Sequence, residues 1–321
     1  MFDITKYITG KQKRNASGWT NFNAPCCQHR GETSDRRMRG GIIGTDTGWS
    51  YHCFNCNFKA NYSTGRALSF NVRRLLTWMG VSENEIQRLS LENLRNRDVG
   101  QILADRNNTK TNVVHFEPVL LPEHARLVTD SDTEIVEYLH SRGIDFATYP
   151  YMVDPTQSRL GVLVPHTYKD QVVGYTTRFL DDRRPKYLNS HQPGYVFGTE
   201  LLMPSWKYAF VVEGVFDALS IGAIAVMHND ISQHQAALLE HIDKEIVVVP
   251  DHDRAGLQLI DRAIDLGYGV SIPNWDTGIK DVNDAVKRYG RLATAISILD
   301  NYNTSKIKIE LARRTIERKL K

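Results

Sequence analysis

Residues 245–260, EIVVVPDHDRAGLQLI, lead from a buried strand into a helix through two aspartates. The apolar residues before Pro250 are continuous rather than alternating, which predicts a strand covered on both faces. Asp251 and Asp253 follow at its carboxyl end, and a helical segment begins directly after them. Residues two apart in an extended segment face the same side, so both carboxylates can meet one divalent ion.

The same alternation of strand and helix continues on both sides of this stretch. Apolar runs such as YAFVVE, AIAVM and YGVSI alternate with helical segments such as SQHQAALLEHI and DVNDAVKRYG. This pattern predicts an α/β fold with a doubly wound parallel sheet of about four strands. Upstream, residues 159–180 predict two strands around a polar turn at Lys169 and Asp170.

Other strand ends bring acidic residues to the same edge of the predicted sheet. Glu213 ends YAFVVE, with Asp217 four residues later, and Asp281 and Asp284 open the helix after YGVSI. Parallel sheets bind ligands at the carboxyl ends of their strands, and clustered carboxylates need cations to offset their repulsion. Oxygen ligands favour Mg²⁺ or Mn²⁺. The alternative for Asp281 is a helix N-cap. The expected ligands of these ions are Glu213, Asp217, Asp251, Asp253 and Asp281.

All four cysteines lie in the first 60 residues. Cys26 and His29 are spaced C-x-x-H, and Cys53 and Cys56 are spaced C-x-x-C. Two such pairs complete a tetrahedral site, so we expect a structural zinc ion held by Cys26, His29, Cys53 and Cys56. Cys27 is then left over. It either packs as a small apolar residue beneath the metal or replaces Cys26 or His29.

Charge is distributed unevenly along the 321 residues, although the formal net charge is only +3. Residues 1–66 hold ten Lys/Arg against four Asp/Glu, and residues 301–321 hold seven Lys/Arg against two Glu. Basic ends around an acidic centre fit a protein that holds a polyanion. No apolar run approaches the roughly 18–20 residues of a membrane span, and no secretory pattern is present. We therefore expect a soluble, cytoplasmic protein with no membrane partner.

Several motifs together resemble one family. VVEGVFDAL and VVVPDHDRAG resemble the TOPRIM fold of topoisomerases and bacterial-type primases. RFLDDRRPKYLNS resembles the basic motif of bacterial-type DNA primases, and CCQH…HCFNC resembles their zinc ribbon. The order of the motifs also matches, over roughly residues 20–290. No phosphate loop of an ATP-driven motor is found. The chain therefore resembles the small phage primases that act with a separate helicase.

The resemblance implies an N-terminal zinc ribbon followed by a primase catalytic core with a TOPRIM sheet. It implies a DNA-directed RNA polymerase, a nucleotidyltransferase that makes short RNA primers on single-stranded DNA from ribonucleoside triphosphates during replication. A phage enzyme would act in the host cytoplasm beside the replicative helicase. The expected domains are a zinc ribbon (1–65), a helical segment and linker (66–120), the N-terminal part of the core with the basic motif (121–207), the TOPRIM domain (208–290) and a basic C-terminal helix or tail (291–321).

The resemblance also implies roles for single residues. Glu213 would be a metal ligand or general base, Asp251 and Asp253 would hold the catalytic ions, and Asp217 and Asp281 would support a second metal position. The residues implied to bind nucleotide or template are Arg159, Arg178, Lys186, Tyr187 and Asn189. One departure is Asn283, where an acidic residue is usual in bacterial forms. The loop between the zinc knuckles is also longer than in those forms.

Two other functions stay open. Nucleases of the TOPRIM group cut phosphodiesters with similar carboxylates, although they need neither a zinc ribbon nor PKYLNS. A non-catalytic accessory that binds single-stranded DNA is the other alternative, against which the intact acidic set argues. The basic tail IKIELARRTIERKLK either docks the helicase or DNA, or packs as a terminal helix on its own domain.

Overall fold

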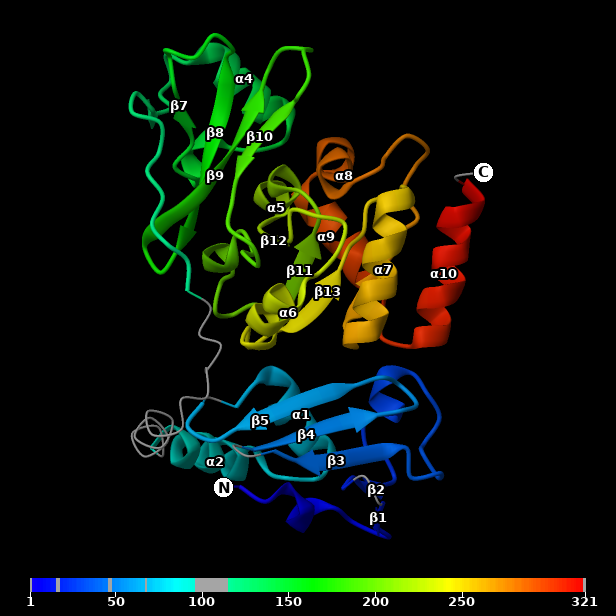
Figure 1. Cartoon of the computed structure of the whole chain (residues 1–321). Coiled ribbons are helices and arrows are strands. Elements are labelled where there is room, and N and C mark those ends of the chain that lie inside the picture. The colour runs from blue at the N-terminus through cyan, green and yellow to red at the C-terminus, as the bar shows by residue number, and fades with distance from the viewer. Residues whose placement is uncertain (1, 16–17, 46–47, 67, 96–114, 320–321) are drawn as a thin grey trace.

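The computed structural model describes residues 2–15, 18–45, 48–66, 68–95 and 115–319. In these residues the chain forms three five-stranded sheets, each made from a different stretch of sequence. Figure 1 shows the first sheet in a separate N-terminal module below the other two. Residues 96–114, which include most of the predicted linker, lie outside the described part. None of the described helices combines the length and apolar character that a membrane crossing requires.

The N-terminal module is an antiparallel sheet with two helices behind it. Its strands, in spatial order, are β1 (Lys13–Arg14), β2 (Thr20–Phe22), β3 (Gly40–Gly44), β4 (Gly48–Cys53) and β5 (Lys59–Ser63). Its two α-helices are α1 (Phe70–Trp78) and α2 (Glu83–Arg95), and it also has two short 3-10 helices, η1 (Ile4–Tyr7) and η2 (Gln28–Arg30). Ser82 Oγ accepts from Glu85 N at 3.4 Å and so caps the start of α2. The four cysteines are part of the buried core of this module.

The middle sheet is also antiparallel, with the spatial order β10-β9-β8-β7-β6. Its strands are β6 (Arg126–Leu127), β7 (Met152–Val153), β8 (Gly161–Tyr168), β9 (Gln171–Phe179) and β10 (Tyr187–Ser190), and α4 (Thr133–Ser141) and η3 (Phe146–Thr148) lie between β6 and β7 in the chain. Lys169 and Asp170 join β8 to β9 with φ of 50° and 62°. Two left-handed residues suit a tight hairpin turn, so the predicted pair of strands and its turn are confirmed.

The third sheet has the spatial order β12-β11-β13-β14-β15, and its first four strands are parallel. Its strands are β11 (Tyr208–Val212), β12 (Ile224–Ala225), β13 (Glu245–Val248), β14 (Gly269–Ser271) and the antiparallel edge strand β15 (Tyr302–Asn303). Its helices are α5 (Val215–Ile221), α6 (Gln233–Glu240), α7 (Arg254–Leu266), α8 (Val282–Tyr289), α9 (Arg291–Asp300) and α10 (Lys306–Lys319), and η4 (Thr199–Leu201) precedes the sheet. The predicted parallel sheet of about four strands is thus confirmed, and β15 and α9 were not predicted.

Alternate residues of β13 explain why helices cover both faces of this sheet. Val247 packs with α5, α8 and α9, whereas Val248 packs with α6, α7 and α10. Ile309 and Ile316 of α10 are buried in the second of these clusters, beside α7 (Figure 1). The basic C-terminal segment therefore packs on its own domain, which was one of the two alternatives for it.

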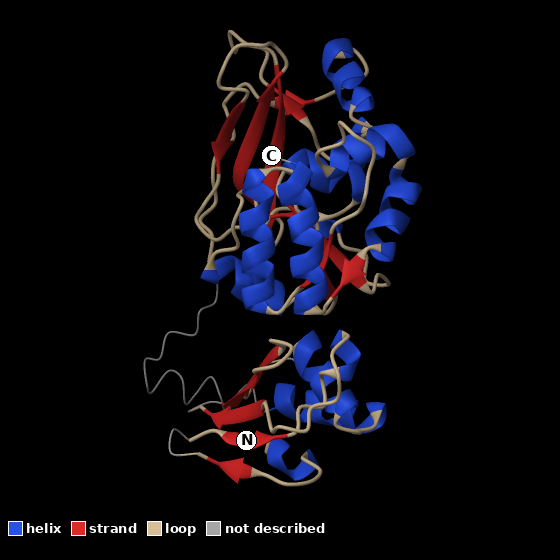
Figure 2. Ribbon diagram, turned by 90° about the vertical axis from the view of Figure 1, so that its right-hand side faces the viewer, coloured by secondary structure: helices blue, strands red, loops and turns tan. Residues whose placement is uncertain are grey.

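The N-terminal module contacts the third sheet at the end where its parallel strands begin. Arg74 Nη1 bonds Glu245 Oε1 at 2.6 Å, and Glu245 is the first residue of β13. Lys59 Nζ donates to Asp265 O at 2.7 Å near the end of α7. Figure 2 shows the module below the third sheet from a second direction. The carboxyl ends of the parallel strands point to the opposite side.

Candidate functional site

Two acidic residues meet at the carboxyl edge of the third sheet. Glu213 directly follows β11, and Asp251 follows β13, the neighbouring strand. Glu213 Oε1 accepts a hydrogen bond from Asp251 N at 3.1 Å. This contact follows from the topology, because parallel neighbours in a sheet end on the same side.

A second pair of aspartates lies at the same edge. Asp217, in the first turn of α5, is buried and accepts from Asn283 N at 2.8 Å. Asp281 is the N-cap of α8 and accepts from Asp284 N at 2.7 Å. Asp281 therefore does act as a helix cap, and its charge also acts on Asp217 at the acidic edge.

Burial and mutual repulsion dominate the electrostatics of this edge. Burial, followed by the nearby charges of Asp217, Glu213, Asp281 and Asp253, raises the pKa of Asp251 to about 9. Burial likewise raises the pKa of Asp217 to about 8, with the charge of Asp281 as the next cause. Carboxyl groups in this state either keep protons at neutral pH or exchange them for a cation.

Asp253 has a structural role in addition to any role at the site. Its Oδ1 accepts from Ala255 N at 2.8 Å and from Gly256 N at 3.0 Å, so it caps α7. In the part of the chain that the structure describes, no three carboxylates bring ligand atoms within 4.8 Å of one another. The acidic residues therefore line a wider site than a single closed cation cage.

The four cysteines form a compact cluster in the N-terminal module. Their sulfur atoms all lie within 4.8 Å of one another, with Cys26 Sγ 3.4 Å from Cys56 Sγ and Cys27 Sγ 3.5 Å from Cys53 Sγ. Hydrogen bonds to the other three sulfurs raise the pKa of Cys26, whereas the bond from Cys26 lowers the pKa of Cys53. Four buried thiols at this spacing are a ligand set typical of structural zinc.

The prediction that His29 is a zinc ligand was wrong, because the structure places the thiol of Cys27 in the cluster instead. His29 lies in η2, where its ring stacks on Trp78 with 5.0 Å between ring centroids and 5° between planes. The chain turns at Cys27, whose carbonyl oxygen accepts from Arg30 N and Glu32 N. This turn directs the adjacent Cys26 and Cys27 inward together, which a two-residue spacing rule does not anticipate.

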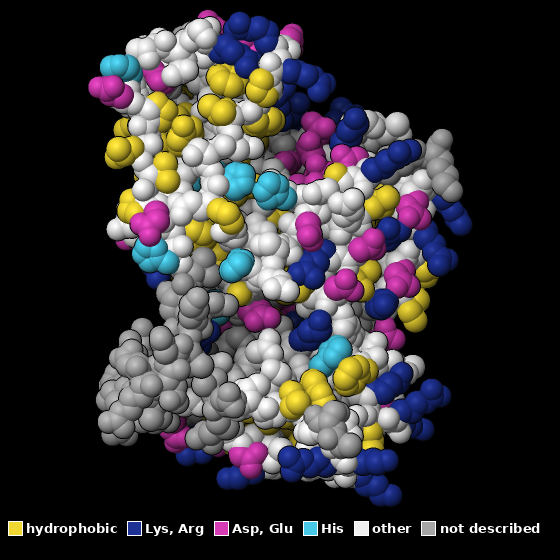
Figure 3. Space-filling model, viewed as in Figure 1, with side chains coloured by type: hydrophobic (Ala, Val, Ile, Leu, Met, Phe, Trp, Pro, Cys, Tyr) yellow, Lys and Arg dark blue, Asp and Glu magenta, His cyan; other side chains and the backbone are white. Residues whose placement is uncertain are grey.

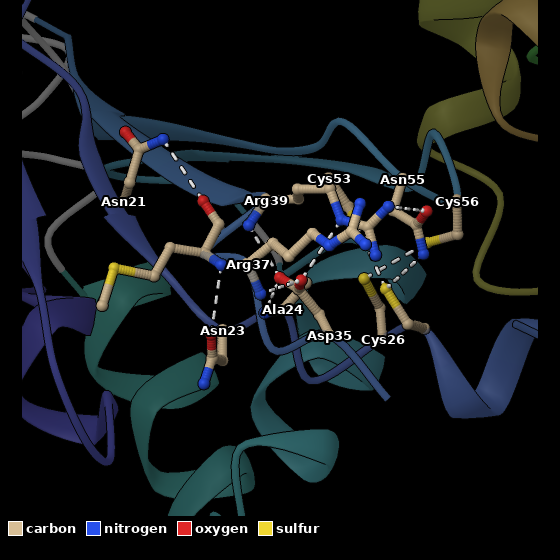
Figure 4. A network of polar contacts seen from close by, with 12 residues as sticks. Asn21, Asn23, Ala24, Cys26, Asp35, Arg37, Arg39, Cys53, Asn55 and Cys56 are labelled. Carbon is tan, nitrogen blue, oxygen red and sulfur yellow. Dashed lines mark hydrogen bonds and ion pairs between the residues drawn. The ribbon is translucent and has the colours of Figure 1, made fainter. Parts of the chain in front are cut away.

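Polar side chains connect this cluster to the strands around it (Figure 4). Asn55 Nδ2 donates to Cys27 Sγ at 3.4 Å, and Arg39 Nη1 donates to Asn55 Oδ1 at 2.5 Å. Arg39 also pairs with the buried Asp35, Nε to Oδ1 at 3.2 Å. Outer contacts of this kind orient metal ligands.

Comparison with known proteins identifies the acidic segment. Residues 210–286 match the family model described as Toprim-like. These residues form a Toprim-like domain. It contains Glu213, Asp217, Asp251, Asp253 and Asp281.

Curated relatives are DNA primases, and each alignment covers only part of them. The primase of Clostridium acetobutylicum is 29% identical over 157 residues, which is 41% of this chain and 26% of the relative. That of Geobacillus stearothermophilus is 30% identical over 144 residues, 39% of this chain and 24% of the relative. That of Aquifex aeolicus is 22% identical over 247 residues, 70% of this chain and 49% of the relative. The resemblance to bacterial-type primases is confirmed, and the chain spans at most about half of these relatives.

Similar solved structures are also primases. The zinc-binding and RNA polymerase domains of the Aquifex aeolicus primase match with 18% identity and a TM-score of 0.39, covering 92% of this chain and 81% of that chain. The primase fragment of the bacteriophage T7 primase-helicase protein matches with 17% identity and a TM-score of 0.42, covering 61% of this chain and 85% of that chain.

Two residues of the basic motif lie beside the Toprim-like domain. The Arg178 guanidinium stacks over the Tyr187 ring, 4.8 Å from its centroid. The Tyr187 ring lies 6.3 Å from that of Phe216 in α5, and Asp217 is among the charges that raise the pKa of this tyrosine, after burial. Asn189 accepts from Thr176 Oγ1 at 3.1 Å.

The other two basic residues form ion pairs within their own hairpin. Arg159 binds Asp181 in a forked pair, with Nε to Oδ2 at 3.0 Å and Nη2 to Oδ1 at 2.5 Å. Lys186 Nζ bonds Asp182 Oδ1 at 2.7 Å. The aspartates of the DDRR run therefore neutralise both cations in this structure.

Sequence reasoning missed Arg142, which links the middle sheet to the Toprim-like domain. Arg142 Nη1 donates to Asn283 Oδ1 at 2.9 Å, and Asn283 Nδ2 donates to Arg142 O at 2.7 Å. Burial raises the pKa values of Asp217 and Asp281, and the positive charge of Arg142 offsets part of this rise. Asn283 is thus a buried residue whose side chain joins α8 to Arg142, rather than one that offers its side chain to a metal ion. No local pattern identifies Arg142, because it simply follows an amphipathic helix.

Proposed function

We propose that this chain is a DNA primase, a nucleotidyltransferase that makes short RNA primers on single-stranded DNA. The observation that carries the proposal is the contact between Glu213 and Asp251 at the carboxyl edge of a Toprim-like domain. The primase names of the curated relatives support the same activity. In the reaction, the 3′-hydroxyl of one ribonucleotide attacks the α-phosphate of the next, and pyrophosphate leaves.

The acidic edge fits divalent ions, because the buried Asp217 and four partly buried acidic residues gather at one edge of the sheet, where their charges repel one another. When bound, Mg²⁺ or Mn²⁺ would neutralise charge that develops on the phosphoryl group and favour ionisation of the attacking hydroxyl. Glu213, Asp251 and Asp253 would hold the catalytic ions, and Asp217 with Asp281 would hold the second position. Arg142 limits the net negative charge at that second position.

The middle sheet would bind the template and the incoming nucleotide. Arg178 and Tyr187 form a cation–ring pair beside α5, which suits a phosphate and a stacked base. The exposed amide of Asn189 adds a hydrogen-bonding group on the same strand. Arg159 and Lys186 would exchange their aspartate partners for phosphates. For Lys186 this exchange costs little, because its partner Asp182 is fully exposed and exposed ion pairs contribute roughly 0–1 kcal/mol. The pair of Arg159 with Asp181 is more enclosed.

The N-terminal module would recognise the start site on the template. Its zinc ion would be held by Cys26, Cys27, Cys53 and Cys56, and its excess of Lys and Arg suits a polyanion. A separate replicative helicase and a location in the host cytoplasm complete the proposal.

One assay tests the activity. The protein is incubated with single-stranded DNA, Mg²⁺ and labelled ribonucleoside triphosphates, with and without a helicase of a related phage. Short labelled RNA in either reaction supports the proposal. Shortened DNA instead favours a Toprim-type nuclease, and a mobility shift without any product favours a binding accessory. Asp251→Asn is the control, since loss of the labelled RNA in that variant ties the synthesis to the acidic edge of this protein.

A further inference from the structure

A pair of histidines meets where the middle sheet adjoins the Toprim-like domain. His191 Nε2 and His228 Nε2 lie 3.1 Å apart, with 5.1 Å between ring centroids and 60° between ring planes. His191 follows β10, and His228 comes three residues after β12. Figure 3 shows histidine side chains gathered beside the acidic side chains on this face. The two imidazoles thus come from distant parts of the chain and converge at the surface.

Both histidines are held on fixed backbone. The residue after the first, Gln192, donates through Nε2 to Val173 O at 2.8 Å. The residue after the second, Asn229, donates through Nδ2 to Gln258 Oε1 at 2.7 Å. Met227 precedes the second histidine with φ of 59°, a left-handed conformation that non-glycine residues rarely adopt. The convergence of the rings is therefore built into two anchored loops.

The separation of the two nitrogens suits two ligands of one metal ion. Two imidazole nitrogens about 2.0–2.1 Å from one ion, in tetrahedral or cis-octahedral geometry, lie about 2.9–3.4 Å apart. His191 Nδ1 is enclosed and has no hydrogen-bond partner in the described part of the chain, so Nε2 is the nitrogen that faces a ligand. A hydrogen bond between the rings explains the distance equally. At an exposed position, however, water competes for that bond, which then contributes little to stability.

We propose that His191 and His228 form a site for a divalent transition-metal ion, of the class of Ni²⁺, Co²⁺ or Zn²⁺. Imidazole nitrogen favours these ions, whereas Mg²⁺ favours oxygen ligands. The site is distinct from the four thiols and from the carboxylates. Val226 N donates to Val212 O at 3.1 Å, so the loop with His228 leaves the sheet at the edge where Glu213 lies. A bound ion would tie the end of β10 to this edge, whether or not the chain makes primers.

Calorimetric titration with Ni²⁺ at pH 8 tests the site, since ordinary imidazole is neutral there. The four proteins compared are the wild type, His191→Ala, His228→Ala and the control His124→Ala, which removes an exposed histidine elsewhere. The thiol cluster is the same in all four proteins, so any difference in the number of Ni²⁺ ions bound comes from the pair of His191 and His228. We expect the wild type and the control to bind one more Ni²⁺ than either pair variant. Equal binding by all four proteins overturns the proposal.

Thermal unfolding gives a second measurement. Ni²⁺ should raise the Tm of the wild type and of His124→Ala by more than that of either pair variant, because all four proteins keep the thiol cluster but only an intact pair adds a further site. His228 is exposed, so its substitution leaves the fold intact and keeps the comparison valid. An equal Tm increase in all four proteins means that Ni²⁺ binds elsewhere, and also overturns the proposal.

Discussion

Asp251 N donates a hydrogen bond to Glu213 Oε1 at 3.1 Å, across two neighbouring parallel strands. This contact joins two acidic residues that are 38 positions apart in the chain. Each carboxylate on its own is ordinary at a strand end. Their meeting at one edge, with Asp217 and Asp281 close by, makes this edge the centre of the proposed chemistry.

The first prediction concerns catalysis by this edge. Asp251→Asn should lower primer synthesis by roughly 100- to 1000-fold, because an amide holds a divalent ion poorly and stabilises the transition state less. DNA binding, measured by fluorescence anisotropy, should stay within about twofold. Primer yield equal to that of the wild type would contradict the assignment of Asp251 as a metal ligand.

The second prediction concerns the pH dependence of stability without added Mg²⁺. The folded-state pKa of Asp251 is raised from 3.8 to about 9 and that of Asp217 to about 8. The folded state thus binds more protons than the unfolded state at these two groups. The stability that they contribute is therefore fully present below pH 3.8 and is lost as the pH rises towards 8–9. In denaturant melts, the free energy of unfolding should decrease from pH 5 to pH 8.5. Asp251→Asn should reduce that slope, and an unchanged slope would exclude Asp251 as its source.

The third prediction separates the two possible ligand sets of the zinc site. Cys27→Ser should lose about one equivalent of zinc, whereas His29→Ala should retain it, because only the thiol lies in the cluster. Cys53→Ser should lose zinc together with start-site choice. Elemental analysis of the purified proteins measures the metal. Zinc retained by Cys27→Ser but lost by His29→Ala would restore the ligand set expected from spacing.

The fourth prediction concerns the contact between the N-terminal module and the third sheet. Glu245 is largely buried and accepts hydrogen bonds from Arg74 and from the Tyr302 hydroxyl. Glu245→Gln should lower the free energy of unfolding by about 1–3 kcal/mol, since it leaves a partly buried arginine without its counter-charge.

The matched control for this contact is Arg73→Ala. It removes the more exposed pair between Arg73 and Asp243, and should change stability by no more than about 1 kcal/mol. Urea unfolding compares the two variants. If both variants lower the free energy of unfolding by the same amount, burial of Glu245 adds nothing to the stability of the contact.

The fifth prediction concerns the C-terminal helix α10. Ile316→Ala should destabilise the protein by about 2–5 kcal/mol, because Ile316 is buried in the cluster that contains α7. The control Ile307→Ala lies on the same helix but is 60% exposed, and should stay within about 0.5 kcal/mol. Equal stability of the two variants by urea unfolding would mean that α10 is not docked in solution.

Much of the fold could be predicted because it depends on local periodicity. The continuous apolar run before Pro250 predicted a covered strand, and alternate residues of β13 do face different helix layers. The turn at Lys169 and Asp170 followed from polar residues between two apolar runs. The edge strand β15 was missed, since two residues carry too little pattern to be recognised.

Pairings of side chains were harder to predict, because they depend on how elements pack. Spacing selected His29 as a ligand, but the turn at Cys27 directs a thiol inward instead. Arg159 was expected to bind nucleotide or template, yet Asp181 already binds it in this structure. In both cases the partner of the side chain was set by residues that lie close to it in the folded chain, and not by the spacing of residues in the sequence.

By itself, the sequence determined the parallel strands of the third sheet, the hairpin of β8 and β9, and which residues end the parallel strands. Those properties follow from periods of two and 3.6 residues and from the shared direction of neighbouring strands. Only the tertiary structure decided that Cys27 replaces His29, that Asn283 joins Arg142, and that His191 meets His228. Such contacts join residues far apart in the chain, and their geometry is set by the packing of sheets and loops rather than by any local preference.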